Sequence, residues 1–143
     1  LEKNKDLFEF FKFMIDYRKK HPVIRKKLDN AVCGMEAMHA HDVNAERMEV
    51  PQNAKTLAVS FAGYDRKKGK DDLVYVAVNA YWEEVKITLP NLANHGAWYL
   101  SVDTYGDEKG KYFYQEGEEI RIDREYVMKP RSIVVFTGRE ILR

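Results

Sequence analysis

Two histidines one residue apart, His39 and His41, are the first candidates for chemistry in this sequence. They lie in the run 39–42, which reads His-Ala-His-Asp. Alternate residues of a β-strand project to the same face, so both imidazoles could bind one metal ion. A third ligand would have to come from His21, His95 or an acidic residue elsewhere. Two polar residues at a strand end explain the run more simply, and we expect neither a metal site nor a cofactor.

The remaining nucleophiles and carboxylates do not form a recognisable catalytic set. The single cysteine, Cys33, lies in a connector of small residues without a basic neighbour that would favour its thiolate. Glycoside hydrolysis needs two carboxyl groups about 5–10 Å apart across a sugar. The adjacent pairs Glu83-Glu84 and Glu118-Glu119 would point to opposite faces of a strand. We therefore assign no catalytic residue.

A basic stretch, residues 18–27 (RKKHPVIRKK), contains six lysine or arginine residues. Such a stretch could contact phosphates, but Glu9 and Asp16 share the preceding helix and no aromatic platform accompanies it. A charge run is usually a solvated face, and the net charge of the chain is only +1. We expect no nucleic-acid partner.

The aromatic pair Tyr81-Trp82 is the best candidate for a ligand surface. It falls between a strand ending at Asn79 and one beginning at Val85, and we expect it at a hairpin tip. An exposed indole can stack on the apolar face of a sugar ring. Alternatively, Trp82 folds over the sheet edge or contacts another domain, an interpretation we favour because one aromatic pair is a small platform. Trp98, which alternates with Leu100, is expected in the core.

The elements that would position these residues are one helix and a series of strands. Residues 4–20 form an amphipathic pattern that ends at His21-Pro22, because a residue before proline avoids the helical conformation. The helix is apolar around most of its circumference and requires neighbours on several sides. The side chains that could face such a neighbour are Phe8, Phe10, Phe11, Phe13 and Met14.

After about residue 56 the apolar residues recur with a period of two. The patterns lie at 57–61, 73–79, 85–89, 98–102, 120–122 and 132–137, and 73–79 is apolar on both faces, as in a central strand. We predict a mainly β fold, an antiparallel β-sandwich of about seven to eight strands preceded by one amphipathic N-terminal helix. The predicted boundaries are 1–30 for the helical segment and 31–143 for the sandwich.

Composition limits the class of protein. The chain is 45% hydrophobic, which is sufficient for a core, and its one cysteine cannot form an internal disulfide. No apolar run is long enough to span a membrane, so we expect no membrane partner. A single free thiol suits a reducing compartment, and we expect a cytoplasmic location.

Several stretches taken in order resemble one family. The helix end Phe11-x-x-x-Ile15-x-x-Arg18-Lys19-x-His21-Pro22-x-x-Arg25 is similar to the last barrel helix of isoamylase- and pullulanase-type glycogen debranching enzymes, members of the α-amylase superfamily. In that family a C-terminal β-sandwich follows. The stretches 56–58, 72–79, 87–90, 98–104 and 130–135 fit its strands in order. Where many members carry Trp-His-Gly before the first sandwich strand, this chain has Ala40-His41-Asp42.

The resemblance implies a domain without catalytic groups of its own. The three catalytic carboxylates of the family lie on strands of the barrel, and none of their motifs occurs here. The parent enzyme would hydrolyse the α-1,6 branch points of glycogen, starch or pullulan, and this sandwich would pack against its barrel and stabilise it. Residues 1–30 would then be the end of that barrel. The alternative is a carbohydrate-binding module that contacts α-glucan through Tyr81 and Trp82. The exposed helix could also cause self-association.

Overall fold

Within the described residues, the fold combines one helix with eight antiparallel strands, as the sequence predicts. The computed structural model describes residues 2–31, 33, 35–41, 56–90, 92 and 96–140. The helix α1 spans Glu2–Lys20, and a 3-10 turn, η1, follows at Pro22–Ile24. The strands are β1 (Met38–His41), β2 (Thr56–Asp65), β3 (Lys70–Asn79), β4 (Val85–Thr88), β5 (Gly96–Asp103), β6 (Ile120–Ile122), β7 (Glu125–Met128) and β8 (Ser132–Glu140).

Six strands form one large sheet and two form a small one. The large sheet has the order β1-β2-β3-β8-β5-β6, and the small sheet pairs β4 with β7. The prediction of a central strand at 73–79 is confirmed, because β3 lies between β2 and β8. Its side chains alternate as expected: Tyr75 and Ala77 face one apolar cluster, whereas Val74 faces another.

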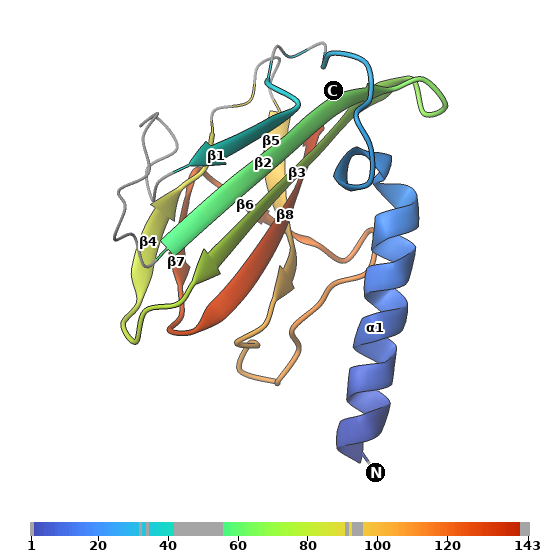
Figure 1. Cartoon of the computed structure of the whole chain (residues 1–143). Helices are drawn as coiled ribbons and strands as arrows, with labels where there is room; N and C mark the ends of the chain where they lie inside the picture. The colour runs from blue at the N-terminus through green and yellow to red at the C-terminus, as the bar shows by residue number, and fades with distance from the viewer. Residues whose placement is uncertain are drawn as a thin grey trace.

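The two faces of the large sheet are covered by different elements, so the molecule has three layers (Figure 1). On one face, Tyr75 and Phe136 pack against Ile87 and Met128 of the small sheet, and all four are completely buried. On the opposite face, Phe13 and Tyr17 of α1 pack against valines of β3, β5 and β8. The small sheet completes the predicted sandwich, and α1 forms a third layer.

The end of α1 is determined by the His21-Pro22 pair. Proline disfavours the helical conformation of the preceding residue, and His21 has φ −120° and ψ 76°, outside the helical region. The chain then turns through η1 and reaches the large sheet, where Asp29 forms an isolated bridge with Tyr64. The segment after α1 is therefore connected to β2 by hydrogen bonds.

One local prediction is wrong. The connection 80–84 is not a hairpin, because β3 pairs with β2 and β8 whereas β4 pairs with β7. Both edges of β3 are already occupied, so the chain has to cross to the other sheet. The prediction that Trp98 belongs to the core is confirmed, since the residue is 2% exposed and its indole N–H donates to the Pro90 carbonyl at 2.8 Å.

Candidate functional site: the helix–sheet seam and the apolar face

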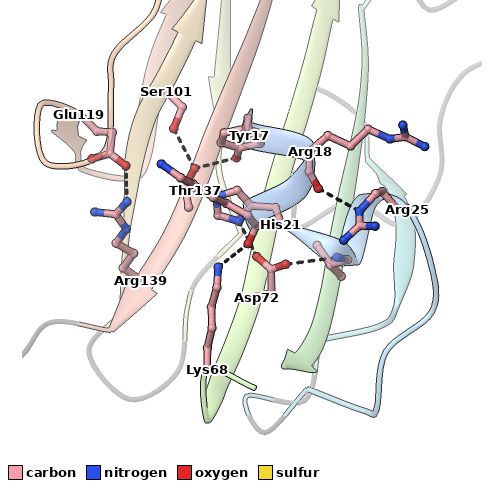
Figure 2. A network of polar contacts seen from close by, with 12 residues as sticks. Tyr17, Arg18, His21, Arg25, Lys68, Asp72, Ser101, Glu119, Thr137 and Arg139 are labelled. Carbon is pink, nitrogen blue, oxygen red and sulfur yellow. Dashed lines mark hydrogen bonds and ion pairs between the residues drawn. The ribbon is translucent and has the colours of Figure 1, made fainter. Parts of the chain in front are cut away.

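The C-terminal half of α1 is attached to the large sheet by buried hydroxyl groups, which we call the helix–sheet seam (Figure 2). The Tyr17 hydroxyl hydrogen-bonds with Thr137 Oγ1 of β8 at 2.7 Å, and Ser101 Oγ of β5 reaches the same oxygen at 2.8 Å. Burial raises the pKa of the Tyr17 phenol above its ordinary value. The phenol therefore stays neutral and joins α1 to two central strands.

A bulge in β5 brings Ser101 to this side of the sheet. The pairing of β5 with β8 shifts between Leu100 and Val102, so one extra residue is inserted there. Leu100 belongs to the sandwich core, whereas Val102 packs in the cluster under α1. Ser101 and Val102 therefore both serve the helix-covered face, one through a hydrogen bond and the other through apolar contact.

A second group of contacts holds the last turn of α1. His21 Nδ1 lies 2.6 Å from Asp72 Oδ1, and the amide N–H of Val23 donates to the other carboxylate oxygen at 3.2 Å. The rings of His21 and Tyr17 lie 4.2 Å apart between centroids. The Lys68 ammonium donates to the carbonyl of Lys20. Together these contacts fix the helix end to β3.

The seam contains imidazole, carboxylate and hydroxyl groups, but the structure does not arrange them for catalysis. The Ser101 hydroxyl bonds to Thr137 rather than to His21, so no nucleophile is joined to a base. The cavity between these groups measures about 50 Å³. That volume holds a few water molecules, whereas ligand sites enclose several hundred cubic ångströms. The seam is consequently a structural joint.

A second feature is a set of large apolar side chains left uncovered on the α1 side of the molecule, which we call the apolar face. On α1 it comprises Leu7, Phe8, Phe11 and Ile15, which are 52%, 67%, 59% and 55% exposed. The spacing of Leu7, Phe11 and Ile15 places them in one row along the helix. The large sheet adds the exposed side chains of Met38, Leu57, Val78 and Ile133.

Strand alternation places the sheet part of the apolar face on the same side as α1. Val78 has the same parity along β3 as Val74, which packs under the helix. Leu57 and Ile133 are the direct cross-strand neighbours of Val78, on β2 and β8. The helix therefore covers only part of this face of the sheet and leaves a second apolar part beside it.

The five helix residues predicted to face another domain lie on different sides of α1. Phe8 and Phe11 are exposed and belong to the apolar face. Phe13 is buried against the sheet, and Phe10 and Met14 are half-buried beside it. Phe10 and Phe13 also contact the ring of Phe113, at centroid distances of 5.9 and 4.9 Å.

Tyr81 and Trp82 lie in the connection that crosses between the two sheets. Trp82 is 63% exposed, and its ring is tilted by 51° from that of Tyr81 at a centroid distance of 5.4 Å. Asn79 fixes this connection, because its side chain accepts from the Tyr81 amide and donates to the carbonyls of Glu83 and Lys129. Because the two rings are tilted, they do not form one flat surface, and the indole of Trp82 is the ring that could stack on a ligand.

The other sequence candidates occupy ordinary structural positions. His39 and His41 both lie on β1, and His39 Nδ1 is 2.9 Å from a carboxylate oxygen of Glu36. The side chain of His41, together with Asp42 and His95, lies outside the described residues. Within the described part of the chain, no three histidine, cysteine or acidic residues could hold a metal ion. Burial raises the pKa of the Cys33 thiol, which disfavours its thiolate.

Three of the four candidate carboxylates are held by a cation. Glu84 pairs with Lys129 and Glu118 with Lys111, both at 3.1 Å, and Glu119 pairs with Arg139. No two of these three carboxylates share a hydrogen bond or a common cation. The pairs of Glu84 and Glu118 lie on the surface, whereas the side chain of Glu119 is 5% exposed in its pair with Arg139. Within the described residues, no helix is long and apolar enough to cross a membrane.

Two features of this region were not predicted from the sequence. The hydroxyls of Ser101 and Thr137 interrupt otherwise apolar strands, and a polar residue at an inward position is the signal that could have identified the seam. No role was predicted from the sequence for the basic residues 66–68, although they line the same groove as residues of the basic stretch 18–27.

Comparison with known families gives one match. The family model described as "Isoamylase, C-terminal" matches residues 35–137, which include all eight strands apart from the end of β8. A search of curated proteins found no match.

Proposed function

Because the chain belongs to the isoamylase C-terminal domain family, we propose that it packs against the catalytic domain of an isoamylase-type enzyme and stabilises it. The observation that carries this proposal is the apolar face. Groups of exposed apolar side chains on one side of a molecule are typical of a contact surface. The chain itself supplies no catalytic group in this proposal.

The helix part of the apolar face supports a partner that covers α1 from outside. Figure 1 shows the N-terminal half of α1 extending past the end of the large sheet. Phe8 and Phe11, at 67% and 59% exposed, lie in this half. Covering the part of each side chain that is still exposed would contribute about 1–2 kcal/mol. A catalytic barrel that receives this stripe would gain stability from it.

The substrate of the parent enzyme follows from the family resemblance and is also part of the proposal. Isoamylase-type enzymes that debranch α-glucans cleave α-1,6 linkages with carboxylates of the catalytic barrel. In this proposal the chain acts on that reaction only by keeping the barrel folded. Substitutions on the apolar face should therefore change how long the enzyme remains active, not its chemistry.

The test uses the complete enzyme that carries this chain. Replacing Phe8 and Phe11 together with glutamate should lower the temperature of thermal inactivation by several degrees, since two apolar contacts become buried charges. The kcat of enzyme that remains folded should stay unchanged. Val127→Glu is the matched control, because Val127 is 48% exposed but lies on the opposite, small sheet. Equal inactivation temperatures for the double variant and the control would refute the proposal.

A second candidate function is binding of α-glucan through Trp82, favoured by the 63% exposure of its side chain. An exposed indole face can stack on a glucose ring. Isothermal titration of the chain with maltoheptaose and branched limit dextrins tests it. Binding that disappears in Trp82→Ala would support a glycan surface, whereas absence of heat at high ligand concentration would eliminate it.

A further inference from the structure

Three Arg-Lys-Lys triplets, at residues 18–20, 25–27 and 66–68, meet at the C-terminal end of α1. The first is the last turn of the helix, the second follows η1, and the third is the turn between β2 and β3. Eight of these cations line a groove of about 540 Å³, together with only two carboxylates, Asp29 and Asp65. The groove thus carries a charge of +6, in a chain whose net charge is +1.

Backbone contacts fix the walls of this basic groove. Asp65 Oδ1 accepts the amide N–H groups of Lys67 and Lys68, at 3.0 and 3.4 Å. On the facing wall, the Tyr64 amide donates to the Asp29 carbonyl at 2.8 Å. The Lys68 ammonium bonds to the Lys20 carbonyl and so joins the third triplet to the first. The backbone positions of the three triplets are therefore set by the fold.

The two carboxylates do not neutralise the groove. Asp65 is 7% exposed and caps the turn, while Asp29 pairs with Arg66. Lys20 pairs with Glu116 at 3.4 Å, outside the groove lining. Among the described residues, no carboxylate pairs with Lys19, Lys26, Lys27 or Lys67. Cations gathered in a concave surface repel one another and focus a positive potential, which favours a bound anion.

The composition of the groove selects among anionic ligands. Among the described residues, Tyr64 is the only aromatic one that lines the groove, and it is half-buried, so bases of a single-stranded nucleic acid would find no stacking platform. Its apolar lining consists of Pro22 and Leu28, too little to insert into a lipid surface. A phosphate monoester carries about −1.5 to −2 charges and is a common ligand of lysine. A volume of about 540 Å³ suits a small molecule of one to a few sugar rings.

We propose that the basic groove binds phosphomonoesters of glucose, either as a free sugar phosphate or as phosphate groups on an α-glucan. The phosphate part rests on the charge and shape of the groove, and the sugar part rests on the proposed function. Lys19, Lys26, Lys27 and Lys67 supply the unpaired ammonium groups that contact the phosphate.

Isothermal titration of the chain with three probes tests the proposal and separates the two sources. The probes are glucose 6-phosphate, phosphorylated dextrin and the same dextrin after phosphatase treatment. We expect at least one of the two phosphorylated probes to bind, and its affinity to fall as salt screens the charges. Binding of glucose 6-phosphate alone would identify the free sugar phosphate as the source. Binding of the dextrin alone would identify the polymer as the source. Measurable and equal binding of treated and untreated dextrin would overturn the proposal, and so would the absence of binding by both phosphorylated probes.

Charge reversal at the groove provides the matched variants. Lys26→Glu combined with Lys67→Glu should weaken phosphate binding at least tenfold, as a change of four charges at the site requires. Lys12→Glu combined with Lys109→Glu changes the net charge equally at two exposed residues outside the groove and should bind like the original chain. Equal affinity of the two double variants would overturn the proposal. So would displacement of the dextrin by an oligonucleotide at equal phosphate concentration.

The two proposals fail independently. The Lys26→Glu and Lys67→Glu double variant should leave the thermal inactivation temperature of the complete enzyme unchanged. The Phe8→Glu and Phe11→Glu double variant should bind the phosphorylated probes with unchanged affinity. Far-ultraviolet circular dichroism of every variant establishes that the chain is folded before either measurement is interpreted.

Discussion

At the scale of single residues, buried tyrosines make the stability of the chain sensitive to alkaline pH. Burial raises the pKa of Tyr17 and of Tyr75 above the ordinary value of 10.0. In the unfolded chain both phenols ionise near pH 10.0, whereas the folded chain keeps the protons. The unfolded state then binds fewer protons, so the free energy of unfolding is unaffected below this pH and falls above it. The slope should be about 1.4 kcal/mol per pH unit for each phenol.

Urea unfolding between about pH 9 and about pH 11 measures this slope. Tyr17→Phe should make the slope shallower by the contribution of one phenol. Tyr105→Phe is the control, because the Tyr105 side chain is 61% exposed in the folded chain. A slope that is the same in Tyr17→Phe and in the original chain would contradict the assignment.

Thr137 is the residue on which the helix–sheet seam depends. Thr137→Val should lower the free energy of unfolding by about 2–4 kcal/mol, because the buried hydroxyls of Tyr17 and Ser101 both lose their hydrogen bond to Thr137. Thr137→Ser keeps the hydroxyl and should lose less than half as much. Chemical denaturation at neutral pH compares the two variants. Equal losses would mean that the methyl group, rather than the hydrogen bonds, stabilises this position.

At the same scale, the sequence was informative about apolar residues and less so about polar ones. Trp98 was placed in the core because it alternates with Leu100. The side chain of an apolar residue in such a pattern faces the core, so the local pattern is sufficient to predict its burial. The partners of Thr137 lie 36 and 120 residues away in sequence. No local pattern contains a contact of that range, so the seam required the folded structure.

At the scale of elements, the segment after α1 crosses β2 at Gly63, where the absence of a side chain permits the contact. A Cβ atom at Gly63 would lie 2.6 Å from Leu28 Cβ, an atom held close to the backbone. Gly63→Ala should therefore push the 28–29 segment from β2 and lower the free energy of unfolding by about 1–3 kcal/mol. Gly69→Asn is the control: its surroundings are open and asparagine tolerates the positive φ of 67°.

Thermal unfolding followed by circular dichroism compares these glycine variants. The crossing carries Asp29 into its bridge with Tyr64, which also forms a wall of the basic groove. Gly63→Ala should for that reason weaken phosphate binding as well as stability. If Gly63→Ala were as stable as Gly69→Asn, the close approach would not be a constraint on the fold.

The central strand was predictable from the sequence because both of its faces are buried. The stretch 73–79 is apolar on both faces because one face meets the small sheet and the other meets α1. The connection 80–84 was misassigned because short spacing between two strands is typical of a hairpin. Which sheet a strand joins depends on whether its neighbour still has a free edge, and that is a property of the whole topology.

At the scale of the whole molecule, the cations and the exposed apolar side chains gather at different places on the surface. The amino-acid composition gives only their totals and does not reveal this separation. A net charge of +1 argues against polyanion binding only if the charges are mixed. Folding instead gathers eight cations in the basic groove and leaves a net negative charge on the rest of the chain. The apolar face likewise appears only when α1 is placed on the sheet, because helix periodicity alone does not distinguish Phe11, which is exposed, from Phe13, which is buried.

The apolar face also predicts the behaviour of the chain when it is separated from any catalytic domain. Two copies could each cover the Phe8 and Phe11 side chains of the other, so we expect dimerisation that increases with concentration. Sedimentation velocity should show a monomer at low concentration and a growing dimer boundary above it.

Phe8→Glu combined with Phe11→Glu should shift the equilibrium to monomer, because association would then bury two unpaired charges. Val127→Glu, on the small sheet, should leave it unchanged. A chain that stays monomeric at every concentration would show that the apolar face is too divided to associate with itself, and that only a larger complementary surface can cover it.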